Sequence, residues 1–191
     1  MTLGPLMVIG GAEDKTGARL VLSRFVRLAG GPAAKIAVIA TASALGDEIV
    51  EAYREAFGAL GVTDIVAPRP TIRAEAADAA LVQQLDDVTA VFMTGGNQGK
   101  LSGVVTGTPF GAAIRAVHAR GGLVGGTSAG ASVQTEHVNA FCSEGSTPKP
   151  RSAQMPARRG LPPGAVIAPA LTPRGRDRSP PTRVPPPPPP P

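Results

Sequence analysis

The chain has 191 residues, which is enough for one domain with a substantial hydrophobic core. Its formal charge of +5 is unevenly distributed: residues 1–148 carry 11 Lys/Arg and 13 Asp/Glu, whereas residues 149–191 carry 8 Lys/Arg and one Asp. We expect neither a nucleic-acid-binding domain nor a membrane span, because the basic excess lies outside the first 148 residues and no apolar run approaches about 18 residues.

Short apolar segments alternate with amphipathic segments along the first part of the chain. The apolar segments predict buried strands at residues 6–9, 36–40, 65–66, 88–93 and 123–124. The amphipathic segments predict helices at residues 16–28 (with Thr16 as the cap), 47–60, 74–85, 100–105 and 110–120. This alternation is typical of an α/β fold, a doubly wound domain with a mostly parallel sheet.

Loops rich in glycine or hydroxyl side chains follow four of the predicted strands. They comprise residues 10–15, 41–43, 94–98 and 126–130. In a parallel sheet these loops meet at the carboxyl ends of the strands, where ligands of such folds bind. The loop at 94–98 can offer backbone N–H groups beside the loop at 126–130; the alternative is that its glycines only end a strand.

Residues 123–131 have the pattern of a nucleophile elbow, in which a serine is exposed at a tight turn between a strand and a helix. Gly126 and Gly130 flank Ser128 at the required spacing. Without Cβ atoms, the two glycines allow the strand and the helix to pass closely while Ser128 keeps a strained backbone. The sequence predicts Ser128 as a nucleophile, with an ordinary glycine turn as the alternative.

The composition changes after Pro148. From there the chain lacks apolar periodicity, and it finishes with seven prolines at 185–191. We therefore predict an α/β domain at residues 1–148 and a proline- and arginine-rich tail, disordered or in polyproline II conformation, at 149–191. A proline-rich ligand for an SH3-like partner is the alternative interpretation of this tail.

The residues that bind metals and phosphates are sparse in this chain. Two histidines and the single cysteine, Cys142, form no ligand cluster, and the glycines at 10–11 lack the spacing of a phosphate-binding loop. We expect no metal and no cofactor. One cysteine excludes an intrachain disulfide and is typical of a reducing compartment, so we expect a cytoplasmic protein.

Three motifs together resemble the cyanophycinase family of serine peptidases, which is related to aspartyl dipeptidases. They are Gly-Gly-Ala-Glu-Asp-Lys at 10–15, Phe-Met-Thr-Gly-Gly-Asn-Gln at 92–98 and Gly-Gly-Thr-Ser-Ala-Gly-Ala at 125–131. The resemblance covers residues 4–148 and implies a fold like that of class I glutamine amidotransferases. It also implies a homodimer and an exopeptidase that hydrolyses cyanophycin (multi-L-arginyl-poly-L-aspartate) to β-Asp-Arg dipeptides.

The resemblance implies roles for individual residues. Ser128 would be the nucleophile, and backbone amides of Gly96 and Ala129 would hold the oxyanion. Gln98 would contact the substrate. An acidic residue after the nucleophile assists catalysis in the family, and Glu144 is our choice for it, with an exposed loop glutamate as the alternative.

The tail matches the family motif at two arginines and departs from it at the catalytic histidine. Arg174 and Arg176 match family positions that engage the acidic polymer, but Ala170 stands where the family has its catalytic histidine. We expect that His118 lies on the helix surface and that His137, nine residues beyond the serine, lies too far along a continuing helix to replace it.

These observations predict a family domain whose C-terminal part is truncated or frameshifted. The sheet of such a domain would keep an uncovered apolar face or edge. Three functions stay open for the chain: a cyanophycinase-like peptidase, inactive if the base is absent; an α-aspartyl dipeptidase; and a non-catalytic protein that binds acidic polymer through its basic tail.

Overall fold

The computed structural model describes residues 2–134, 137–138 and 166–167. Five strands in the first of these ranges form a parallel sheet in the order β1-β5-β4-β2-β3. The strands are β1 (Leu6–Ile9), β2 (Lys35–Ile39), β3 (Asp64–Val66), β4 (Ala90–Met93) and β5 (Leu123–Thr127). Two further short strands, β6 (His137–Val138) and β7 (Val166–Ile167), pair with each other in parallel.

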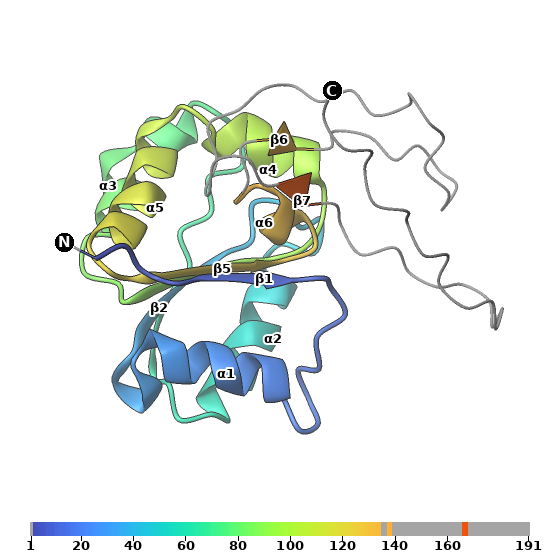
Figure 1. Ribbon diagram of the computed structural model, residues 1–191. Helices are drawn as coiled ribbons and strands as arrows, with labels where there is room; N and C mark the ends of the chain where they lie inside the picture. Colours follow the sequence, from blue (N-terminus) through green and yellow to red (C-terminus); the bar gives the residue numbers. More distant parts are fainter. Residues whose placement is uncertain (1, 135–136, 139–165, 168–191) are drawn as a thin grey trace, which may run out of the picture.

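Helices cover both faces of the five-stranded sheet, with α1 and α2 below it and α3 to α6 above it in Figure 1. The helices are α1 (Leu20–Ala29), α2 (Asp47–Gly58), α3 (Ala79–Gln83), α4 (Gln98–Val105), α5 (Pro109–Ala119) and α6 (Ala129–Ser132), with 3₁₀ turns η1 (Gly31–Ala33) and η2 (Glu75–Ala77). The parallel sheet between two helical layers confirms the predicted doubly wound α/β fold. None of the helices in the described part is long and apolar enough to cross a membrane.

Each face of the sheet carries its own hydrophobic core. The layer of α1 and α2 contains a cluster of aromatic rings, in which Phe25 meets Phe92 edge-on at a centroid distance of 5.0 Å. The opposite layer is aliphatic around Val91 and Val124, with Phe110 and Leu101 packed against them. The central strands β2, β4 and β5 are buried on both faces, which explains why their sequences are continuous apolar runs rather than alternating ones. The edge strand β1 is less covered than predicted, since Val8 is 46% exposed.

Several predicted helix boundaries differ from the structure. Thr16 does not cap α1, which begins at Leu20 without a side-chain cap, because the Asp14 carboxylate binds the N–H groups of the preceding turn instead. The predicted helix at 74–85 is divided into η2 and α3, because Asp78 has extended backbone and caps α3 through the Ala80 N–H. The predictions at these two places were wrong.

His118 was predicted at the surface, and this prediction is also wrong, because His118 is only 5% exposed. The buried face of α5 consists of Phe110, Gly111, Ile114, Val117 and His118. This spacing of three and four residues puts the histidine on the stripe that packs against the sheet.

The crossing of β5 and α6 depends on small residues. A Cβ atom at Gly126 would lie 2.4 Å from the Gly130 carbonyl, and one at Gly130 would lie 2.1 Å from the Met93 carbonyl oxygen. Both distances are far inside van der Waals contact. Helix α6 therefore lies directly on the backbones of β4 and β5, which only glycine permits.

We predict that Gly130→Ala lowers the free energy of unfolding by at least about 2 kcal/mol, because the backbone of α6 must move away from β4. Gly103→Ala is the matched control, since it also lies in a helix but has no atom within 4 Å of the added methyl group. We expect this control to stabilise the fold by about 0.5–1 kcal/mol. Urea unfolding measures both changes, and equal stabilities of the two variants would contradict the packing argument.

Candidate active site

Ser128 lies at the sharp turn between β5 and α6, with φ 51° and ψ −110°. Its N–H donates to the Ile9 carbonyl at 2.9 Å, and its own carbonyl accepts hydrogen bonds from Ala131 and Ser132 at 3.1 Å. A positive φ is uncommon for a residue with a Cβ atom and costs on the order of 1–3 kcal/mol. Strand, strained serine and helix follow each other here in the geometry of a nucleophile elbow.

Two other loops contact Ser128 from the neighbouring strands. A Cβ atom at Gly11, in the β1–α1 loop, would lie 3.5 Å from the Ser128 Cβ. One at Gly95, in the β4–α4 loop, would lie 3.4 Å from the same Cβ and 3.9 Å from the Ser128 Oγ. The convergence of glycine-rich loops predicted from the sequence is therefore present around this serine, which itself remains half-buried.

The two predicted oxyanion donors come from the turn itself and from the β4–α4 loop. Ala129 is the first residue of α6, and Gly96 follows Gly95 in a loop that packs against the Ala42 carbonyl. Within the described residues, neither Gly96 nor Ala129 donates a backbone hydrogen bond from its N–H group. Donors without an internal acceptor are what an oxyanion site requires.

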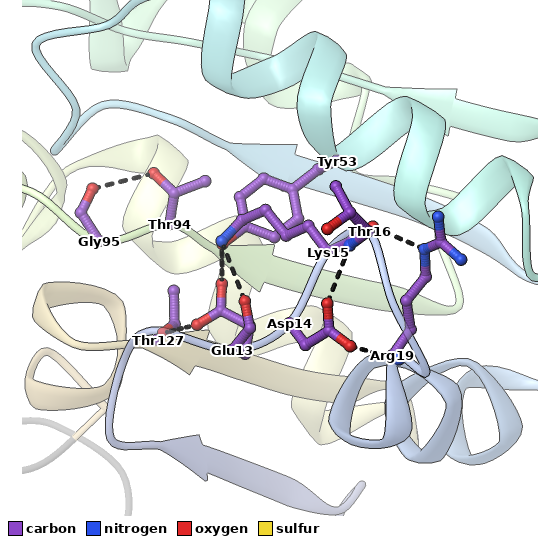
Figure 2. Close-up of polar contacts among 9 residues, drawn as sticks. All are labelled: Glu13, Asp14, Lys15, Thr16, Arg19, Tyr53, Thr94, Gly95 and Thr127. Carbon is purple, nitrogen blue, oxygen red and sulfur yellow. Dashed lines mark hydrogen bonds and ion pairs between the residues drawn. The ribbon is translucent and has the colours of Figure 1, made fainter.

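The structure reveals a buried polar network that the sequence reasoning did not identify (Figure 2). At its centre is Glu13, whose side chain is 1% exposed. Its carboxylate accepts hydrogen bonds from the hydroxyl groups of Tyr53 on α2 and Thr127 on β5. Lys15 Nζ lies 2.8 Å from Glu13 Oε1 and 4.9 Å from the centre of the Tyr53 ring.

Burial raises the pKa of Glu13, but the hydrogen bonds that it accepts, foremost from Lys15, outweigh this effect and lower the pKa overall. Burial and the bond to Glu13 raise the pKa of Tyr53, so the phenol remains a donor. Glu13 is thus an ionised carboxylate inside the fold, compensated by one cation and two hydroxyl groups.

Asp14, next in the chain, has the opposite environment and is exposed. Its carboxylate accepts backbone N–H groups from the turn that follows: Gly17 at 2.7 Å, Arg19 at 3.0 Å and Thr16 at 3.0 Å. These bonds, the one from Gly17 foremost, lower the pKa of Asp14 to about 2. The two adjacent acids therefore shape one loop, Glu13 from the inside and Asp14 from the outside.

Of the remaining predicted site residues, only Gln98 lies within the described part of the chain. Gln98 is half-buried at the first position of α4, close behind the β4–α4 loop. Glu144, Arg174, Arg176 and Ala170 lie outside the described residues. Among the described residues, no group of three or more His, Cys, Asp or Glu side chains is arranged to hold a metal ion.

His118 lies away from the elbow. Its carbonyl accepts a hydrogen bond from the N–H of Gly4, just before β1 begins, whereas Ser128 follows the carboxyl end of β5. The two residues therefore lie at opposite ends of the strands. The length of a strand, at a rise of about 3.3 Å per residue, separates them. His137 begins β6 rather than continuing α6.

Comparisons with known proteins agree with this arrangement. The model of peptidase family S51 matches residues 6–158. A cyanophycinase from Geminocystis herdmanii (strain PCC 6308) is 35% identical over 163 residues, covering 85% of this chain and 60% of that protein. A cyanophycinase from Synechococcus elongatus is 38% identical over 106 residues, covering 56% of this chain and 33% of that protein.

Solved structures show the same fold. A peptidase from an acI-B1 actinobacterium superposes with a TM-score of 0.61 at 24% identity, over 72% of this chain and 59% of that chain. The chain spans 60% or less of the length of each of these three relatives. Together, the matches confirm the resemblance inferred from the three motifs.

Asp14→Asn is predicted to destabilise the fold in a pH-dependent manner. A carboxylate whose pKa is about 2 in the folded state and about 3.9 in the unfolded state stabilises the fold above pH 4. That stabilisation is lost as the pH falls from 4 towards 2. The urea midpoint of the wild type should therefore exceed that of the variant at pH 7, with a difference that shrinks below pH 4.

Glu55→Gln, which removes an exposed carboxylate from α2, is the control for this experiment. Its free energy of unfolding should stay within about 0.5 kcal/mol of the wild-type value at pH 7. A difference between wild type and Asp14→Asn that stays constant from pH 7 to pH 3 would contradict the prediction.

Proposed function

The chain belongs to peptidase family S51, and we propose that it is a serine-type peptidase of the cyanophycinase type with Ser128 as its nucleophile. Its substrate in this proposal is cyanophycin, from which it releases β-Asp-Arg dipeptides. The observation that carries the proposal is the strained backbone of Ser128 at the strand-to-helix turn. Strain of this kind is retained where the surrounding structure over-determines it, as at active sites.

In the proposed reaction, Ser128 Oγ attacks the carbonyl carbon of the scissile peptide bond, and the negative charge develops on the carbonyl oxygen. The N–H groups of Gly96 and Ala129 stabilise that charge. The proton lost by the Ser128 hydroxyl passes to the leaving amine, and water then hydrolyses the acyl-enzyme to a free carboxylic acid and restores the serine hydroxyl. Gly11 and Gly95 support this assignment because they lie close to Ser128 and neither has a side chain that would cover it.

Binding of the substrate is assigned to Gln98, Arg174 and Arg176, and the assisting acid to Glu144. Gln98 is supported by its place at the start of α4, immediately after the loop that contacts Ser128. The two arginines suit a polymer with an aspartate backbone because they carry positive charge at neutral pH. Their assignment, like that of Glu144, rests on the family motif.

The general base is the weak point of the catalytic apparatus. The buried His118 lies at the far edge of the sheet, and Ala170 occupies the position that matches the family histidine. Serine is a poor nucleophile without a base, and losing one triad member leaves only about 10³–10⁴-fold catalysis over water. We therefore expect slow turnover in this chain, with the elbow itself intact.

Reaction with a fluorophosphonate tests the nucleophile directly. We predict slow, covalent labelling of the wild type at Ser128 and none of Ser128→Ala, measured by peptide mass spectrometry. Ser23→Ala, which removes a half-buried serine from α1, should be labelled like the wild type. An unlabelled wild type with a native unfolding transition would overturn the proposal of an activated serine.

A comparison of substrates tests the specificity. We expect β-Asp-Arg dipeptides from cyanophycin and no cleavage of α-aspartyl dipeptides, with Ser128→Ala inactive on both. Chromatography of the products over hours suits the slow rate. Preferential cleavage of α-aspartyl dipeptides would identify a dipeptidase instead, and salt-sensitive binding of polyaspartate without turnover would identify a non-catalytic binder.

A further inference from the structure

We propose that Glu13 and Thr127 are positioning residues, which together hold the peptide before Ser128 so that the elbow keeps its strained conformation. The inference rests on the proposed role of Ser128 and adds the contacts that orient this serine. The Glu13 carboxylate accepts a hydrogen bond from the hydroxyl of Thr127, the residue immediately before the proposed nucleophile. Figure 2 shows this bond at the end of β5.

The side chain of Thr127 points away from the side of β5 on which the glycines of the elbow pack. Alternate residues of β5 face the α1 and α2 layer, where Gly125 meets the Phe25 ring and Thr127 meets Glu13. Gly126 faces the other layer and contacts Gly130. Thr127 is 4% exposed, so its hydroxyl is spent on the buried carboxylate and is not available to a substrate.

The β1–α1 loop reaches the elbow at two points. Gly11 lies close to Ser128, since a Cβ atom added at Gly11 would be 3.5 Å from the Ser128 Cβ, and Glu13, two residues later, binds the Thr127 hydroxyl. The Ile9 carbonyl, at the end of β1, accepts the Ser128 N–H. Three interactions therefore restrain Ser128: Gly11 beside its side chain, the hydrogen bond from its N–H group, and the bond to the residue before it. Together they fix the position of Ser128 and the orientation of its side chain.

The Glu13 carboxylate is suited to anchoring and not to proton transfer. Its Oε1 binds Tyr53 and Lys15, and its Oε2 binds Thr127, so both oxygens have donors. The side chain is also closed to solvent. Through Lys15 and Tyr53, the anchor connects β5 to the β1–α1 loop and to α2, which lies on the other face of the sheet from α6 (Figure 1).

The test compares variants of Thr127 with a matched buried threonine. Thr127→Val keeps the size and removes the donor, Thr127→Ser keeps the donor, and Thr108→Val removes a buried hydroxyl at the start of α5. The first readout is the second-order rate of labelling of Ser128 by the fluorophosphonate. The second is hydrogen exchange of the peptide that spans residues 123–132, which needs no reactive serine.

We expect Thr127→Val to slow labelling about 10- to 100-fold, because a displacement of about 1 Å at a reacting atom can cost that much. Exchange in residues 123–132 should accelerate about tenfold in this variant, as local opening becomes easier. Thr127→Ser should stay within about twofold of the wild type in both measurements. Thr108→Val should lower the thermal midpoint while leaving labelling and exchange at the elbow unchanged.

The two readouts separate this inference from the proposed function. If the wild type is not labelled, yet exchange accelerates in Thr127→Val only, the proposed nucleophile is wrong and the anchor is correct. If Thr127→Val keeps the wild-type exchange, or if Thr108→Val changes exchange at the elbow equally, the positioning role is overturned whatever the labelling shows.

Discussion

The close approach of three backbones at the elbow is the constraint on which the site depends. Helix α6 lies on β4 through Gly130 and on β5 through Gly126, at distances that exclude any Cβ atom. At this crossing Ser128 adopts a positive φ, which is a strained conformation for a residue with a Cβ atom. The cost of that strain must be offset by the surrounding contacts, so the backbone geometry of Ser128 depends on the packing of the core.

A second constraint is the charge of Glu13. An ionised carboxylate inside a protein is costly unless it is paired and hydrogen-bonded, and Glu13 is both. The adjacent Asp14 meets no such cost because it is exposed, and it orders the outer turn through backbone N–H groups. The short motif at 10–15 therefore has two functions in the fold. Glu13 holds β5 through buried bonds, and Asp14 orders the exposed turn through backbone N–H groups.

The sheet and the strand-to-helix turn at Ser128 could be predicted from the sequence because their signals are local. Apolar runs bounded by glycines mark buried strands, and β1 at 6–9 has the predicted bounds. The Glu13 network could not be derived, because its partners Tyr53 and Thr127 are 40 and 114 residues away and neither spacing leaves a pattern. The burial of His118 was missed for a different reason: a lone histidine at a helix end is polar by type, whereas its position on the apolar stripe of α5 decided its environment.

The elbow and the chemistry that would use it belong to different parts of the chain. Among the described residues, the contacts that fix Ser128 come from residues between Ile9 and Ser132. The residues that the family motif assigns to the acid, the arginines and the histidine position all follow Val138: Glu144, Ala170, Arg174 and Arg176. The strain at Ser128 therefore does not depend on a base being present. A chain with an alanine in place of the histidine can retain a fully formed elbow, because packing and buried hydrogen bonds maintain it and catalysis does not.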